Sequence, residues 1–319
     1  MTHQPMHAHD PSLNDDTHPP HPDRRRFIAA LTATSAGLVM GAPSLAEAAS
    51  NRASLQRQVV ELVTSMRRQG LLQPFEKTSW SVYDFTARKK VVSINEGTPR
   101  QAASMIKPFV AQAYFFQMER ARGRLPYNDE IRQAMERMIQ RSNNADTNRI
   151  MDLVSAHSAQ RGPADVEAVL KQRAPAVFQE TSIVERIPTT GQTYRNKASA
   201  HDYSRFLVSI WNDQLASSQE LKRLMGLPSG NRLSKGVAAL PEATRVYNKT
   251  GSTAMCCGDM GIIEIPNHRG HNHAYTLVGI IERPSRAENY PAWIKSRGDL
   301  IRRVSSLVYL DMKSRYQLV

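Results

Sequence analysis

The order of strand and helix patterns along the chain constrains its fold more than any single motif does. Residues 80–94 form two short apolar stretches around the basic turn 87–90, and the strand patterns "TRVYNKTG", "MGIIEI" and "AYTLVGIIE" come only near the end. From Ser104 to about Ser218 the apolar residues recur at helical spacing. One sheet can form only if the early hairpin pairs with the late strands, so the middle of the chain must fold as a separate helical lobe.

Helical patterns also border this arrangement, at residues 53–70 and 294–312. We therefore predict an α/β fold of the α+β kind, in which an antiparallel sheet is flanked by N- and C-terminal helices and joined to an all-helical lobe at about residues 104–225. One domain over residues 49–319 would hold both parts, with the substrate cleft between them. Residues 173–197 contain two prolines and a glycine and are predicted to form a long surface loop.

The first 48 residues have the parts of an export signal. A lead rich in His and Pro is followed by "DRRRFI", residues 23–28, which is similar to a twin-arginine signal peptide. The mild apolar run at residues 28–42 is too short for the roughly 20 apolar residues that span a bilayer. Small residues at Ala46 and Ala48 suit a signal peptidase, so we expect cleavage after Ala48. Export by the twin-arginine machinery would deliver a mature protein without a membrane span to the periplasm.

The mature chain is strongly basic. Removal of residues 1–48 takes away 3 of the 42 lysines and arginines and 5 of the 29 acidic residues, which leaves a net charge of +15. Such a chain is drawn to anionic surfaces, such as cell-wall polymers or lipid headgroups. Nucleic acid is not an expected partner, because no basic run is interleaved with aromatic residues. We expect a monomer.

The cysteines and histidines do not indicate a metal or a redox site. Cys256 and Cys257 are adjacent, a spacing at which a disulfide closes only through a strained ring. His268, His271 and His273 fall in a polar turn, where we interpret them as solvated residues rather than metal ligands. No cofactor and no metal are expected.

The stretch "AASMIKPFV", residues 102–110, places Ser104 and Lys107 one helical turn apart at the expected start of an apolar helix. Pro108 fits there, because the first amides of a helix have no intrahelical acceptor. Burial and the positive end of the helix both disfavour a protonated lysine, so Lys107 could accept the proton of the Ser104 hydroxyl. The arrangement suits an activated nucleophile, although an SxxK match alone is no rarer than chance.

Two further motifs follow in order. "SNN" at residues 142–144 lies at the junction of two predicted helices, where a helix cap is the alternative interpretation. "KTGS" at residues 249–252 ends a predicted strand, where a plain strand end is the alternative, and a KTG match is far rarer by chance than SxxK. Upstream of it, Arg232 and Lys235 are either partners for a substrate carboxylate or members of a solvated turn.

SxxK, SxN and KTG in this order resemble the penicillin-recognising serine acyltransferases, most closely the class A β-lactamases. The likeness covers essentially all of the mature chain and implies a β-lactam or a peptidoglycan stem peptide as substrate. It implies that Ser104 attacks the amide carbonyl, that Lys107 takes its proton, and that Ser142 relays a proton to the leaving nitrogen. Lys249 would hold the Ser142 hydroxyl and orient a substrate carboxylate. The other implied roles are substrate binding by Asn144, Thr250, Gly251 and Ser252, and an oxyanion hole made by the backbone amides of Ser104 and Ser252.

The sequence departs from the class A pattern in two places. Ser142 follows Ser104 by only 38 positions, fewer than in typical class A enzymes, so the cleft should be more open. The loop "QETSIVERIPTTGQTYRN" lacks the ExxLN motif that carries the family's deacylating glutamate. Matching the loop places Ile187 at the glutamate position, and Glu185 could act as the base only if the loop register shifts.

Three functions stay open on these grounds. The first is a β-lactamase-type serine hydrolase that opens β-lactams, with slow release of the product. The second is a cell-wall D-alanyl-D-alanine peptidase with the same nucleophile. The third is a binding module without catalysis, against which the complete set of nucleophile, base and proton relay argues.

Overall fold

The computed structural model describes residues 45–188, 190, 195–268 and 270–319. The predicted twin-arginine segment and its His- and Pro-rich lead lie outside the described residues. Within the described ranges, no helix combines the length and the apolar character needed to cross a membrane.

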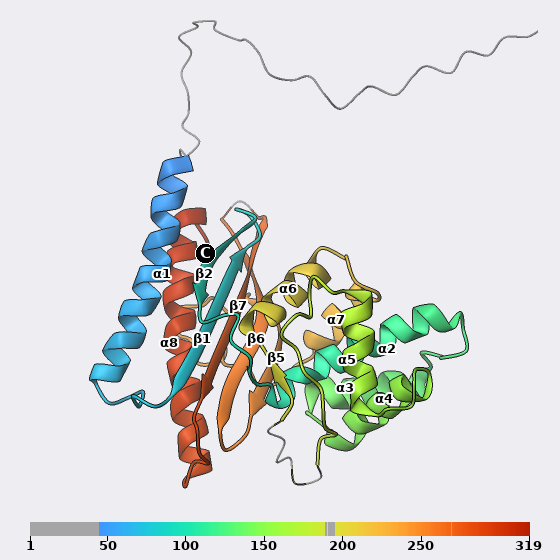
Figure 1. The fold of residues 1–319 in the computed structure, drawn as a ribbon. Coiled ribbons are helices and arrows are strands. Elements are labelled where there is room, and N and C mark those ends of the chain that lie inside the picture. Colours follow the sequence, from blue (N-terminus) through green and yellow to red (C-terminus); the bar gives the residue numbers. More distant parts are fainter. Residues whose placement is uncertain (1–44, 189, 191–194, 269) are drawn as a thin grey trace, which may run out of the picture. The chain divides into compact units, whose positions relative to one another are not determined.

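The predicted fold class is confirmed by a five-stranded antiparallel sheet with helices beside it (Figure 1). Its strands lie in the order β2-β1-β7-β6-β5. Their bounds are Lys77–Asp84 for β1, Lys89–Ile94 for β2, Arg245–Ser252 for β5, Cys256–Pro266 for β6 and Asn272–Glu282 for β7. Strand β1 pairs with β7 from Lys77 opposite Glu282 to Asp84 opposite Tyr275. The early hairpin therefore joins the late strands, as the order of patterns requires.

Two helices from opposite ends of the chain lie side by side on one face of the sheet (Figure 1): α1, Leu45–Arg68, and α8, Tyr290–Tyr316. Both are longer than the predicted helices at residues 53–70 and 294–312. The remaining helices are η1 (a 3₁₀ turn, Ala103–Ile106), α2 (Lys107–Ala121), α3 (Asp129–Gln140), α4 (Asn144–Ala156), α5 (Pro163–Arg173), α6 (Ala200–Trp211) and α7 (Ser218–Met225). A two-residue ladder of β3 (Arg100–Gln101) with β4 (Lys197–Ala198) precedes η1 and α6.

The sheet separates two hydrophobic clusters, which we call the lobe core and the outer core. The lobe core lies between the sheet and α2–α7, and the outer core lies between the sheet and helices α1 and α8. Neighbouring side chains in a strand point to opposite faces, so Cys256 belongs to the lobe core and Cys257 to the outer core. Both thiols are free and buried, and they donate to Gln101 O at 3.2 Å and to Ile294 O at 3.8 Å, respectively.

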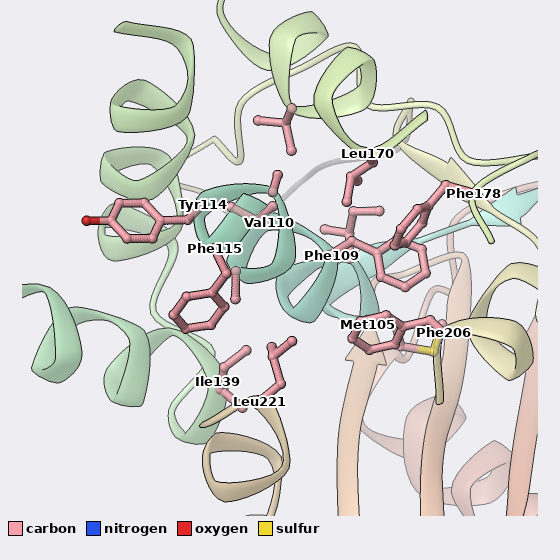
Figure 2. Close-up of a cluster of buried hydrophobic side chains, with 14 of the residues drawn as sticks. Met105, Phe109, Val110, Tyr114, Phe115, Ile139, Leu170, Phe178, Phe206 and Leu221 are labelled. Carbon is pink, nitrogen blue, oxygen red and sulfur yellow. The ribbon is translucent and has the colours of Figure 1, made fainter. Parts of the chain in front are cut away.

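Helix α2 is the centre of the lobe core (Figure 2). Its side chains are buried on every face from Lys107 to Gln117, which is the pattern of a helix enclosed by other elements rather than of a surface helix. The Phe109 ring packs edge-on against Phe178 and Phe206, with centroids 4.8 and 5.0 Å away. The helix that begins next to Ser104 is therefore held on all sides.

Two predictions made from the local pattern of Pro, Gly and polar residues are wrong in part. Residues 173–197 are not simply a surface loop, because Phe178, Ile183 and Ile187 are buried in the lobe core. His273 is not solvated, because it lies in β7, is buried, and stacks on the Tyr316 ring with centroids 4.2 Å apart. In both cases tertiary packing decides burial, and the local pattern of Pro, Gly and polar residues does not.

Truncation of the central aromatic cluster should destabilise the protein. Phe109→Ala removes a ring with no exposed surface, and the cavity left should lower the free energy of unfolding by about 3–5 kcal/mol. Phe75→Ala, at a side chain that is 49% exposed, should lower it by less than about 1 kcal/mol. Urea titrations of both variants check this, and equal losses would contradict the central role of α2.

Candidate active site

Ser104 occupies the 3₁₀ turn η1, against the end of strand β5. Ala103 before it has a φ of 46°, in the left-handed region, and the turn runs directly into α2 with Pro108 in its first turn. Gly251 in β5 allows the close approach, since a Cβ there would lie 2.9 Å from Met105 Cγ and 3.1 Å from Ala103 Cβ. The glycine of the KTG motif thus lets the strand lie beside the serine.

The Lys107 amine joins three parts of the site. It donates to Ser104 Oγ at 3.0 Å, to the Ser142 carbonyl oxygen at 2.7 Å and to Asn144 Oδ1 at 2.8 Å. The residue has no exposed surface. Burial first, and then the charge of the nearby Lys249, lower the pKa of Lys107 to about 7. A large fraction of the amine is therefore neutral near pH 7 and able to accept a proton from the serine hydroxyl.

A second serine and lysine pair stands opposite the first. Ser142 lies between α3 and α4 with a φ of 55°, and Lys249 Nζ donates to its Oγ at 2.5 Å and to Thr250 O at 3.1 Å. Burial is the main cause that lowers the pKa of Lys249 to about 8; Asp259 raises it and Arg232 lowers it further. Asn143 caps α4 by accepting from the Asp146 amide at 2.9 Å. The cap interpretation is therefore correct for Asn143. Ser142 Oγ instead accepts from Lys249, and Asn144 Oδ1 accepts from Lys107.

Arg232 is a buried member of the site that sequence reasoning left undecided. Its Nη2 donates to Ser252 Oγ at 2.7 Å and its Nη1 to Gly258 O at 2.8 Å. Its backbone amide donates to the buried Asp259 carboxylate at 2.6 Å. These contacts depend on the pairing of β5 with β6, which places Thr250 opposite Asp259, so no local motif could have revealed them. Lys235 is exposed.

The loop before β4 brings Ile187, not Glu185, to helix α4. Asn148 donates to Ile187 O at 2.7 Å and accepts from Ile187 N at 2.8 Å. Asn148 is four residues after Asn144, hence on the same helix face as the group that holds Lys107. Glu185 Oε1 instead accepts from the Arg195 amide at 3.0 Å. An apolar side chain, 3% exposed, therefore occupies the position matched to the deacylating glutamate.

The predicted residues thus come together from η1, α2, the α3–α4 junction and β5. Within the part of the chain that the structure describes, no group of three or more His, Cys, Asp or Glu side chains could hold a metal ion. The chemistry available is that of a hydroxyl nucleophile beside a partly neutral amine, with a second hydroxyl and amine to move a proton.

Comparison with known proteins identifies a family and solved structures of the same fold. A family model described as the beta-lactamase enzyme family matches residues 123–310. A solved leucine-to-glutamate variant of PBP-A, in an acyl-enzyme complex with penicillin G, is 19% identical, with 82% of this chain and 97% of that chain covered and a TM-score of 0.63. A class A beta-lactamase from Bacteroides cellulosilyticus is 16% identical, with 82% and 99% covered and a TM-score of 0.62. No curated protein matches the sequence.

The lowered pKa of Lys107 predicts how stability varies with pH. Between pH 7 and about 10.4, the ordinary pKa of lysine, the unfolded chain binds one more proton at Lys107 than the folded chain does. The free energy of unfolding of the parent should therefore rise with pH relative to Lys107→Met, by at most about 1.4 kcal/mol per pH unit. Urea titrations from pH 6.5 to 9.5 measure this. The exposed Lys295→Met should show no such trend, and a flat difference for Lys107→Met would refute the buried, neutralised amine.

Proposed function

The chain belongs to the beta-lactamase enzyme family and has the class A fold, and from this premise we propose that it is a serine hydrolase that forms an acyl-enzyme on Ser104 and releases it slowly. The observation that carries the proposal is the Lys107 amine, 3.0 Å from Ser104 Oγ and with a pKa of about 7. Ser104 Oγ attacks the carbonyl carbon of a β-lactam amide while its proton passes to Lys107 Nζ.

The leaving nitrogen needs a proton when the amide C–N bond breaks. Ser142 Oγ supplies it and recovers a proton from Lys249 Nζ, which lies 2.5 Å away. The product of this step is an ester of Ser104 with the ring-opened β-lactam. Both lysines take part in the transfer, so a pKa near the working pH at each suits the reaction.

The positive charge at the end of β5 suits a substrate carboxylate. Arg232 and Lys249 are buried next to Ser252 and Ser142, and a guanidinium can bind a carboxylate with two parallel hydrogen bonds. Thr250 and Ser252 would add their hydroxyls, Asn144 would bind the substrate's side-chain amide, and Gly251 lets this strand lie close to η1.

The oxyanion would be bound by the backbone amides of Ser104 and Ser252. The close approach of β5 to η1, which Gly251 permits, supports this pairing of amides. Such a donor is worth about 3–4 kcal/mol in the transition state.

Deacylation is the step for which the site is poorly equipped. A water must lose a proton to attack the ester. The residue at the matched position, whose backbone Asn148 of α4 binds, is Ile187, and its side chain has no group that accepts a proton. The acyl-enzyme would therefore persist.

The same observation favours a second candidate, a cell-wall D-alanyl-D-alanine peptidase. Peptidases of this type bind β-lactams and turn them over slowly, and the solved PBP-A acyl-enzyme shares the fold. The net charge of the mature chain would draw it to anionic wall polymer. A non-catalytic binding module is the remaining alternative, for which a buried lysine beside a serine would have no use.

We also propose export to the periplasm by the twin-arginine machinery, on the sequence of residues 23–48. Nothing in the described residues bears on it, and fractionation of cells that express the full chain tests it.

Adduct formation separates the two acylating enzymes from a binding module, and the rate of adduct loss shows how fast the acyl-enzyme is hydrolysed. The protein is incubated with a fluorescent penicillin and a chromogenic cephalosporin, and its mass is followed with time. A stable adduct on Ser104 with little turnover is the expected result for slow deacylation, and Ser104→Ala should form none. Rapid turnover would identify an efficient β-lactamase, and the absence of any adduct on the parent would exclude both enzymatic functions.

A carboxylate at position 187 should speed deacylation. Ile187→Glu places a general base on the backbone segment that Asn148 holds, and general-base catalysis typically contributes about a hundredfold or more. We expect the half-life of the penicillin adduct to fall at least about tenfold, measured by mass spectrometry. The control is Ile187→Gln, because glutamine has the size of glutamate without its charge. An equal fall of the half-life in both variants would mean that disturbance of the loop causes the change.

A further inference from the structure

A basic groove lies at the end of the lobe remote from Ser104. Helices α2 and α4 begin at the candidate active site, with Lys107 and Asn144, and their C-terminal residues line this groove. It consists of two adjoining cavities of about 500 and 320 Å³ that share Arg120, His157 and Ser158. Arg124 lines the first cavity and Arg161 the second. We refer to these five residues as the basic groove.

Of the three groove arginines, Arg161 forms an ion pair with a carboxylate of the described residues, Asp165, at 3.1 Å. Within the described ranges, no carboxylate forms an ion pair with Arg120 or Arg124. The nearest in sequence, Glu119, is paired with Arg173. Asp165, which lines the second cavity, is fully buried and accepts from Ser155 Oγ and from the amide and side chain of Arg161.

The helix ends would repel an anion if their carbonyl groups were unsatisfied. Side chains of the lobe donate hydrogen bonds to several of these carbonyl groups. His157 Nδ1 donates to Leu153 O at 2.9 Å, Ser158 Oγ to Val154 O at 2.8 Å, and Gln117 Nε2 to His157 O at 3.1 Å. On α2, Arg124 Nε donates to Ala121 O at 3.4 Å.

The shape and chemistry of the groove suit phosphate groups on an extended chain. Guanidinium forks match phosphate oxygens in pairs, and three arginines along two joined cavities suit repeated anions better than one. A flat lipid surface fits less well, because the groove is concave and lacks large exposed apolar side chains to insert. Those are found elsewhere, at Val60, Phe75, Val184, Tyr290 and Leu310.

We propose that the basic groove binds the phosphate groups of an extended anionic polymer. Helix α2 has 15 residues, so the polymer would be held about 20 Å from Ser104, at a site separate from the acylation chemistry. The binding does not depend on the proposed enzymatic function, and Ser104→Ala should retain it unchanged.

The test uses linear polyphosphate as the probe and titration calorimetry of the purified protein. Arg120→Gln with Arg124→Gln should weaken binding at least about tenfold, because two charge-assisted contacts are lost. The control double variant Arg57→Gln with Arg303→Gln removes two exposed arginines from α1 and α8 and should weaken it less than about twofold.

Three results would overturn the proposal. Equal losses in the two double variants would mean general charge attraction rather than a site. Equal affinity for polyglutamate of the same charge would remove the assignment to phosphate. Binding to phosphatidylglycerol vesicles without binding to polyphosphate would identify a membrane surface instead.

Discussion

The site depends on one buried amine. Lys107 holds Ser104 of η1, the Ser142 carbonyl between α3 and α4, and the Asn144 side chain at the start of α4. A charged lysine is unfavourable in the buried interior, and burial therefore lowers the pKa of Lys107. Burial disfavours the charged form of Lys107 and so makes its neutral amine available as a base. The burial that costs the lobe stability therefore raises the reactivity of Ser104.

The charges around this amine explain why the site would accept an anion. Lys107, Lys249 and Arg232 are buried within one region, and Asp259 is the carboxylate that faces them from β6. The charge of Lys249 lowers the pKa of Lys107, and Arg232 adds to the lowering of the pKa of Lys249 by burial. A substrate carboxylate would offset the positive charge of these side chains. Its negative charge would also favour the protonated forms of the two lysines that act on the substrate.

Much of this could be predicted from sequence where the cause is local. Ser104 and Lys107 are one turn apart on a continuous backbone, and the pairing of the early hairpin with the late strands follows from their separation along the chain. Arg232 was left undecided because its contacts require the register of β5 against β6. The burial of Phe178 and His273 does not follow from the local sequence, because Phe178 lies between two prolines and His273 follows polar residues. Their neighbours in space are the lobe core and Tyr316. The choice of Ile187 over Glu185 rests on two hydrogen bonds to Asn148, which no alignment of motifs contains.

The adjacent cysteines give the two halves of the molecule separate reporters. Cys256 is sealed between the sheet and the lobe, and Cys257 between the sheet and α8. A thiol reagent can reach the first only when the lobe core opens and the second only when the outer core opens. The order in which the two sulfur atoms become labelled therefore records which layer separates from the sheet first.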